Sequence, residues 1–79
     1  MSIQLPNSIG DITEIEHRGV SATLRRLSAA LVVVEVDGRE TGSFIRDGDH
    51  YVARTGRGEK SHDHRVDSLE DAVFYATRR

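Results

Sequence analysis

The chain has 79 residues, of which 37% are hydrophobic, and it carries a formal net charge of −2. This length allows one domain, covering residues 1–79, with a small core. The lack of cysteine excludes disulfides and thiolate metal sites, and the negative charge gives no overall attraction to nucleic acid. No apolar run approaches the roughly 20 residues of a membrane-spanning helix, and the start of the chain lacks the layout of a secretion signal. We therefore expect a cytoplasmic domain with no membrane partner.

The amino-terminal part of the chain is open to two interpretations. Residues 1–10, which contain the only proline, are expected to form a partly ordered arm. Residues 12–30 are compatible with either a helix or a strand. The helical spacing is that of Leu24, Leu27 and Leu31, and the strand-like alternation is that of Val20, Ala22 and Leu24. Because alanine, leucine and arginine are good helix formers, the sequence favours a helix over residues 21–30, with an additional strand as the alternative.

Two Asp-Gly pairs organise the middle of the chain. They stand at residues 37–38 and 47–48, and each lies between runs of β-branched and aromatic residues. This arrangement is a strong short-range signal for a two-residue β-hairpin. The sequence therefore predicts a three-stranded antiparallel meander with strands at residues 31–36, 40–46 and 49–55.

The predicted register places apolar side chains on both faces of this meander. If both Asp-Gly pairs are type I′ turns, Val34 lies opposite Thr41 and Phe44 opposite Tyr51. One face then carries Val32, Val34, Val36, Ile45 and Val52, and the other carries Leu31, Val33, Phe44, Tyr51 and Ala53. Antiparallel sheets with one side in water usually have a polar face. We therefore expect two covers, with a carboxy-terminal helix on one face and amino-terminal residues on the other.

The carboxy-terminal segment predicts the clearest helix, over residues 68–78. Asp67 is a candidate N-cap, with Glu70 three residues later as in a capping box. An apolar stripe follows at Leu69, Ala72, Val73 and Ala76. Residues 62–66, before this helix, are expected to form a short extended run. The predicted fold class is therefore α+β, a three-stranded antiparallel β-meander with a carboxy-terminal helix packed on one face.

Two polar clusters are candidate binding sites. The first is basic and would contact a nucleic-acid backbone through Arg54, Arg57, Lys60 and Arg65. The second is a pair of histidines, His62 and His64, which point to the same side of an extended segment and could hold a metal ion with His50 as a third ligand. These give two alternative functions, a nucleic-acid-binding domain and a metal-binding module.

The sequence indicates no catalytic chemistry. No serine lies in a nucleophile-elbow motif, and a domain this small has little room for a pocket that excludes water. We expect a protein that is not an enzyme, with no cofactor and no small-molecule substrate.

Aromatic side chains mark the candidate protein interface, which consists of Phe74, Tyr75, Phe44 and Tyr51. On the predicted helix, Phe74 and Tyr75 flank the apolar stripe instead of lying in it, and aromatic residues are enriched at interfaces. Together with two apolar sheet faces, this favours a small non-catalytic interaction module as the leading hypothesis. Such a module would bind a protein partner or form a homodimer.

Overall fold

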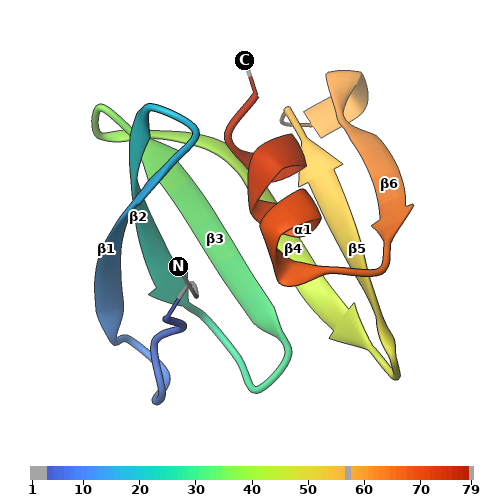
Figure 1. Ribbon diagram of the computed structural model, residues 1–79, viewed down its shortest axis with the longest axis horizontal. Coiled ribbons are helices and arrows are strands. Elements are labelled where there is room, and N and C mark those ends of the chain that lie inside the picture. The colour runs from blue at the N-terminus through green and yellow to red at the C-terminus, as the bar shows by residue number, and fades with distance from the viewer. Residues whose placement is uncertain (1–3, 57, 79) are drawn as a thin grey trace.

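The computed structural model describes residues 4–56 and 58–78, and within them it contains a six-stranded antiparallel sheet and one α-helix (Figure 1). The strands are β1 (Ile12–His17), β2 (Val20–Arg26), β3 (Leu31–Val36), β4 (Arg39–Asp47), β5 (His50–Thr55) and β6 (His62–Val66). A short 3-10 helix, η1 (Gly58–Lys60), precedes β6, and α1 (Leu69–Ala76) follows it. The strands lie side by side in chain order, so each connection joins two neighbours.

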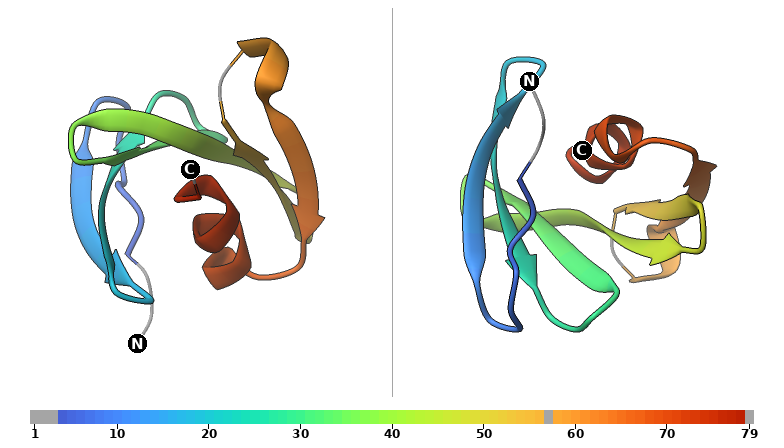
Figure 2. Two further views of the ribbon diagram at one scale, coloured as in Figure 1. Left: turned by 90° about the horizontal axis from the view of Figure 1, so that it is seen from above. Right: turned by 60° about the horizontal axis from the view of Figure 1, so that its bottom comes forward.

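The sheet is strongly curved and wraps around α1 (Figure 2). We term the side that faces α1 the concave face and the opposite side the convex face. The core lies on the concave face, and its buried side chains are Ala22, Leu24, Val32, Val34, Val36, Phe44, Ala53, Ala72, Val73 and Ala76. The buried residues of α1 are alanines and one valine, and these small side chains let the helix approach the sheet closely.

The predicted count of three strands is wrong, and so is the predicted helix over residues 21–30. The three predicted strands are present as β3, β4 and β5, each within one residue of its expected ends. β6 is the extended run expected at residues 62–66, and it pairs with β5. The remaining two strands, β1 and β2, form an additional hairpin from residues 12–26, so the strand alternative for this segment is the correct one.

The turn of the β1–β2 hairpin explains why the sequence did not reveal it. Arg18 and Gly19 both have positive φ (52° and 81°), as a type I′ turn requires. Arginine is an unusual first residue for this turn because left-handed backbone is unfavourable for residues with a Cβ. The Arg18 guanidinium lies 4.6 Å from the centre of the Phe74 ring, and this cation–π contact offsets part of that cost.

A β-bulge in β4 overturns the predicted register. Val34 lies opposite Gly42 and Val32 opposite Phe44, one residue further along β4 than expected, because Thr41 is an extra residue in this strand. A shift of one residue moves a side chain to the opposite face of a sheet. Phe44 therefore shares the concave face with Val32 and Val34, although the sequence placed it on the other face.

The two Asp-Gly pairs form different turns. The first, at residues 37–38, has positive φ at both positions (55° and 79°) and is the predicted type I′ turn. In the second hairpin His50 lies opposite Asp47, so the central residues are Gly48 and Asp49. Of these two only Gly48 has a positive φ (62°), which is the type II′ pattern. The predicted pairing is wrong by two residues here, and a shift of two keeps each side chain on its face.

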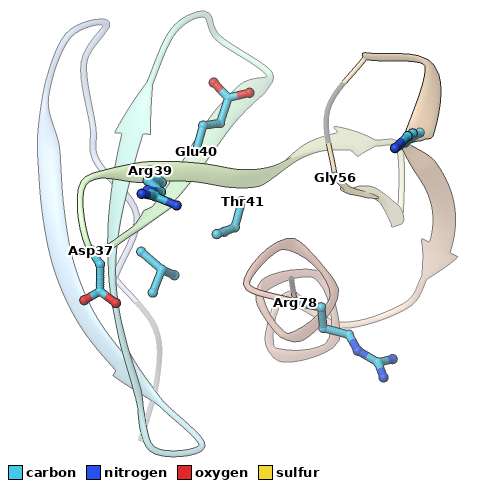
Figure 3. Close-up of a pocket in the computed structure, with 8 residues that line it drawn as sticks. Asp37, Arg39, Glu40, Thr41, Gly56 and Arg78 are labelled. Atoms are coloured by element: carbon cyan, nitrogen blue, oxygen red, sulfur yellow. The ribbon is translucent and has the colours of Figure 1, made fainter.

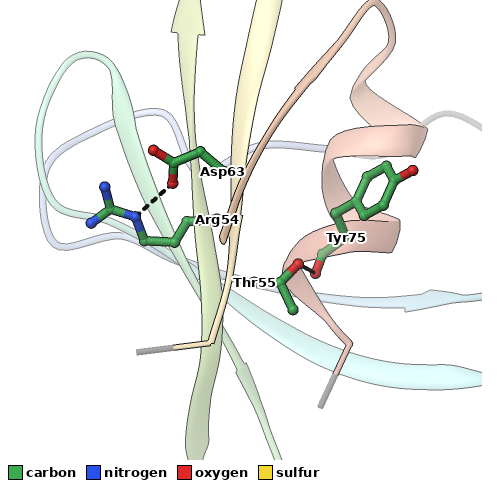
Figure 4. A network of polar contacts seen from close by, with 4 residues as sticks. All are labelled: Arg54, Thr55, Asp63 and Tyr75. Atoms are coloured by element: carbon green, nitrogen blue, oxygen red, sulfur yellow. Dashed lines mark hydrogen bonds and ion pairs between the residues drawn. The ribbon is translucent and has the colours of Figure 1, made fainter. Parts of the chain in front are cut away.

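The carboxyl end of α1 sits directly on β4. A Cβ at Gly42 would clash with the Arg54 carbonyl oxygen on β5 and would lie 2.6 Å from the Ala76 carbonyl oxygen, so a side chain does not fit at this position. The Thr41 hydroxyl donates a hydrogen bond to the same oxygen (2.8 Å), and the Thr55 hydroxyl donates one to the Tyr75 carbonyl oxygen (2.7 Å; Figure 4). These bonds satisfy helical acceptors that have no partner within α1.

The amino end of α1 is capped by Ser68. The sequence predicted Asp67 as the N-cap, and that prediction is wrong. The Ser68 hydroxyl accepts a hydrogen bond from the Asp71 backbone N–H (3.1 Å). Asp67 instead contacts His50, with 2.8 Å between the Asp67 Oδ1 and the His50 Nδ1. Glu70 and Asp71 lie in the first turn, where the helix dipole favours negative charge.

The amino-terminal arm does not cover the convex face. Leu5 packs against the core, and the Arg26 Nε donates a hydrogen bond to the Pro6 carbonyl oxygen (2.6 Å). Residues 1–3 of the predicted arm lie outside the described residues. Within residues 4–56 and 58–78, the expected second cover is absent because residues 12–26 belong to the sheet itself.

Substitution of Gly42 tests the seating of α1. We expect Gly42→Ala to lower the free energy of unfolding by about 1–3 kcal/mol, because its Cβ would clash with the carbonyl oxygens of Arg54 on β5 and of Ala76 on α1. The φ of Gly42 is not left-handed, so the effect is steric and not conformational. Urea unfolding measures the change, with Ser43→Ala on the convex face as the control. Equal stability of the two variants would contradict the close contact between β4 and α1.

Candidate functional site

An apolar row crosses the convex face. Leu31 on β3 lies opposite Ile45 on β4, and Ile45 lies opposite Val52 on β5. Leu27 follows β2 and extends the row, because its backbone N–H donates to the Leu31 carbonyl oxygen (3.0 Å). Ile12, on the edge strand β1, alternates onto the same face. We term these five residues, Ile12, Leu27, Leu31, Ile45 and Val52, the apolar patch.

Most of the large hydrophobic side chains that are exposed belong to the apolar patch. Ile12 is 54% exposed, Leu27 48% and Ile45 38%, and among the described residues only Ile9 joins them as a large exposed hydrophobic side chain. Leu31, Ile45 and Val52 also line a shallow depression of about 160 Å³. Single exposed apolar residues are ordinary, but a contiguous group on one face is typical of a binding surface.

Charged residues of both signs flank the apolar patch. Arg25 lies opposite Ile12, between it and β3, and forms an ion pair with Glu35 with 3.5 Å between their charged atoms. The Arg54 Nε lies 2.9 Å from the Asp63 Oδ1, and these two residues stand on neighbouring strands at the β6 edge (Figure 4). An apolar centre with a charged rim is the common anatomy of a protein–protein interface.

The Arg54–Asp63 pair changes the pKa of both groups. The hydrogen bond from Arg54 lowers the pKa of the Asp63 carboxyl below its usual value, and the positive charge of Arg54 acts in the same direction. The same hydrogen bond, together with the negative charge of Asp63, raises the pKa of Arg54. Both side chains are about half exposed, so solvent screens the interaction and its contribution to stability is small.

The four aromatic residues of the predicted interface do not form one exposed surface with the apolar patch, although Phe44 lines the depression beside Ile45. Phe44 is only 2% exposed and is buried in the core, where its ring meets that of Tyr51 edge-to-face at 6.3 Å. Tyr75 stacks on His64 with 4.2 Å between ring centres, and Phe74 meets Tyr75 edge-to-face at 5.4 Å. An interface through these four residues stays a prediction, and its aromatic rings are engaged in contacts within the domain.

Of the predicted nucleic-acid contacts that the structure describes, two lie on the convex face and one lies beyond the end of β5. Arg54 and Arg65 alternate onto the convex face, Arg54 in its pair with Asp63. Lys60 belongs to η1, beyond the end of β5, and Arg57 lies outside the described residues. Nucleic-acid binding by this set stays a prediction.

The histidines of the predicted metal site are also separated. His62 and His64 share one face of β6, opposite Thr55 and Ala53 on β5. His50 lies at the other end of β5, where it contacts Asp67. Within the described residues there is no group of three possible ligands placed to hold a metal ion. Metal binding by His62 and His64 stays a prediction.

None of the five residues of the apolar patch belonged to the predicted interface, and the predicted register placed Leu31 on the opposite face from Ile45 and Val52. Ile12 lay in a segment without a clear periodicity, and Leu27 was assigned to the stripe of a helix that does not exist. The alternation of Glu14 and Glu16 with Thr13 and Ile15 was an available signal for a strand. The Arg18-Gly19 turn was not recognised in the sequence, so no predicted hairpin supported this signal.

Comparisons with known proteins give no relative. No protein-family model, curated protein or solved structure matches this chain. Among the described residues, no helix has the length and apolar character needed to cross a membrane. The function therefore has to be inferred from the surfaces of the domain. Location in the cytoplasm stays a prediction.

Titration of Asp63 tests the ion pair beside the apolar patch. Its pKa is lowered in the folded state, so its stabilising effect is present above the unfolded-state pKa and is lost as the pH falls through the folded-state pKa. We expect Arg54→Gln to raise the pKa of Asp63 towards its usual value, as measured by carboxyl carbon NMR. Arg46→Gln, which removes a guanidinium bonded to the Gly48 carbonyl oxygen, is the control and should leave that pKa unchanged. An unchanged pKa in Arg54→Gln would contradict the pairing.

Proposed function

We propose that this domain is a non-catalytic protein-interaction module that self-associates through the convex face of its sheet. The observation that carries the proposal is the apolar patch, in which Leu27, Leu31, Ile45 and Val52 form one row on a face that no other described element covers. Burial of such a row against a second protein removes apolar surface from water, which is the main driving force of association.

The chemistry around the row supports a second copy of this chain as the partner. A two-fold symmetric dimer places the same surface on both sides of the interface, so the surface must complement itself. The convex face carries both signs of charge beside the row, with Arg65 as a cation, Glu14 as an anion, and Arg25 and Glu35 as an ion pair. In a face-to-face arrangement the cations of one copy can meet the anions of the other.

The geometry of the sheet also suits this arrangement. Two β-sheets pack face to face about 10 Å apart with interdigitating apolar side chains. The exposed Ile45 is central to the row, and the nearby depression of about 160 Å³ offers a place for an apolar side chain of the partner. A domain of 79 residues has a small core, and association would add a second apolar layer to it.

Sedimentation tests the proposal directly. We expect the mass of the protein to rise towards that of a dimer as its concentration increases, and we expect Ile45→Glu to weaken this association by about tenfold or more because a carboxylate would be buried in the interface. Asn7→Glu is the matched control, since it adds the same charge at an exposed position of the amino-terminal arm.

The outcomes separate the proposal from its alternatives. A monomeric mass at every concentration, or equal association of Ile45→Glu and the unchanged protein, would contradict self-association through this face. A loss of association in Phe74→Ala but not in Ile45→Glu would indicate the interface predicted from the aromatic residues instead. Circular dichroism of each variant shows that the fold is retained.

A further inference from the structure

The outer side of β1 is an open edge of the sheet. β1 pairs with β2 on its inner side, and within residues 4–56 and 58–78 no strand pairs with its outer side. The residues before β1 lie on the side of the sheet that faces α1, so they leave this edge uncovered (Figure 2). An open edge presents a row of backbone N–H and C=O groups, with which the backbone of another chain can pair.

The two-residue turn of the β1–β2 hairpin determines which backbone groups lie along this edge. The pair that flanks such a turn exchanges both of its backbone hydrogen bonds, and bonded pairs then alternate along the strands. The bond that the Arg26 N–H donates to the Asp11 carbonyl oxygen (3.1 Å) continues this alternation just before β1. The odd-numbered residues of β1 are therefore bonded to β2, and the N–H and C=O groups of Ile12, Glu14 and Glu16 are directed outward.

The side chains of these three residues are exposed on the convex face. Residues directly opposite each other in a strand pair share a face, so a strand added here would place its own side chains opposite Ile12, Glu14 and Glu16. Neither glutamate forms an ion pair with the part of the chain that the structure describes. Both line a depression of about 430 Å³ beside β2, which has room for a long side chain of a partner.

The β1 edge lacks the features that usually prevent edge pairing. Such features are prolines, β-bulges and lysines. All six residues of β1 pair with β2 without a register shift, and none of them is proline or lysine. The charges on the exposed side of β1 have one sign, so they repel an acidic strand and attract a basic one.

Charges of one sign also distinguish this edge from the pocket of about 710 Å³ at the carboxyl end of α1. The lining of that pocket includes Asp37 and Glu40 as well as Arg39 and Arg78. Figure 3 shows Arg39 and Arg78 apart, with the Arg78 side chain directed away from the pocket. That pocket therefore has no like charges that converge on one ligand, whereas the two glutamates of β1 are neighbours on one face of one strand.

A second copy of this chain does not fit the β1 edge. If two β1 strands pair antiparallel, the two registers with the longest overlap place Glu14 opposite Glu14 or Glu16 of the second copy. If β6 of a second copy pairs antiparallel with β1, a register that sets Arg65 opposite one glutamate sets Asp63 or Asp67 opposite the other. Like charges directly opposite each other destabilise a strand pair. The occupant that suits this edge is therefore a different chain.

We propose that the β1 edge binds an extended segment of another protein, in which basic residues alternate with β-branched ones. The segment runs antiparallel to β1 and continues the pattern of the sheet. Lysine or arginine lies opposite Glu16 and Glu14, and an apolar residue lies opposite Ile12. Backbone hydrogen bonds supply the affinity, and the side chains select the sequence. This binding does not require self-association, although Ile12 also belongs to the apolar patch.

Amide NMR with a synthetic peptide tests this proposal. The probe is acetyl-Lys-Val-Lys-Thr-Val-amide, whose lysines would lie opposite Glu16 and Glu14 and whose last valine would lie opposite Ile12. We expect saturable shifts along β1 and at least threefold slower hydrogen exchange of the Glu14 and Glu16 amides, which the free protein exposes to water. The amides of Thr13 and Ile15 already bond to β2, so their exchange is the internal reference and should change less.

Matched peptides and variants separate backbone pairing from charge. N-methylation of both lysine backbone nitrogens removes the N–H groups directed to β1 and should abolish binding, whereas N-methylation of the threonine, whose N–H points away, should not. Replacement of both lysines of the probe by glutamate should also abolish binding. Glu14→Gln and Glu16→Gln should each weaken binding by about threefold, as for loss of one cross-strand ion pair. Glu59→Gln, which removes an exposed carboxylate on η1, should leave the affinity unchanged.

Each opposite result overturns a definite part of the proposal. Equal binding of the peptide methylated at its lysines would show attraction to surface charge without an added strand. Equal binding of the acidic peptide, or unchanged affinity in both Glu14→Gln and Glu16→Gln, would exclude selection by charge. Weaker binding to Ile45→Glu would place the peptide on the apolar patch instead of the edge, and unchanged binding supports the edge. The amide spectrum of each variant before titration shows that it is folded.

Discussion

The fold depends on the seating of the carboxyl end of α1 on β4. The bulge at Thr41 and the missing side chain at Gly42 act together there, because the bulge turns Thr41 towards the helix and the glycine lets Ala76 approach. The same bulge brings Phe44 onto the concave face, where it becomes part of the core. Without the extra residue, β4 would present Ile45 to the helix instead. One residue thus decides which apolar side chains are buried and which are left outside.

The consequence is an unequal division of the apolar residues between the two faces. α1 has eight residues and is the only α-helix in the described part of the chain, so it covers the concave face alone. The bulge leaves Ile45, and Val52 opposite it, on the convex face, where they lie beside Leu31. Val33 lies among them and is still only 7% exposed, because its neighbours on the adjacent strands screen it. The convex face therefore has a partly buried centre and exposed apolar side chains around it. Surfaces that become buried when two proteins associate commonly have an apolar centre of this kind.

Local signals in the sequence predicted the parts of the fold that depend on neighbouring residues. The type I′ turn at residues 37–38, the strands β3 to β5 and the existence of α1 follow from Asp-Gly pairs, β-branched runs and helical spacing. The β1–β2 hairpin could not be predicted in this way, because its turn begins with Arg18 and is supported by a contact with Phe74, far away in the sequence. The bulge in β4 could not be predicted for a similar reason, since it is stabilised by the contact of Thr41 with Ala76. The register of the sheet, and with it the composition of the apolar patch, depends on these distant contacts.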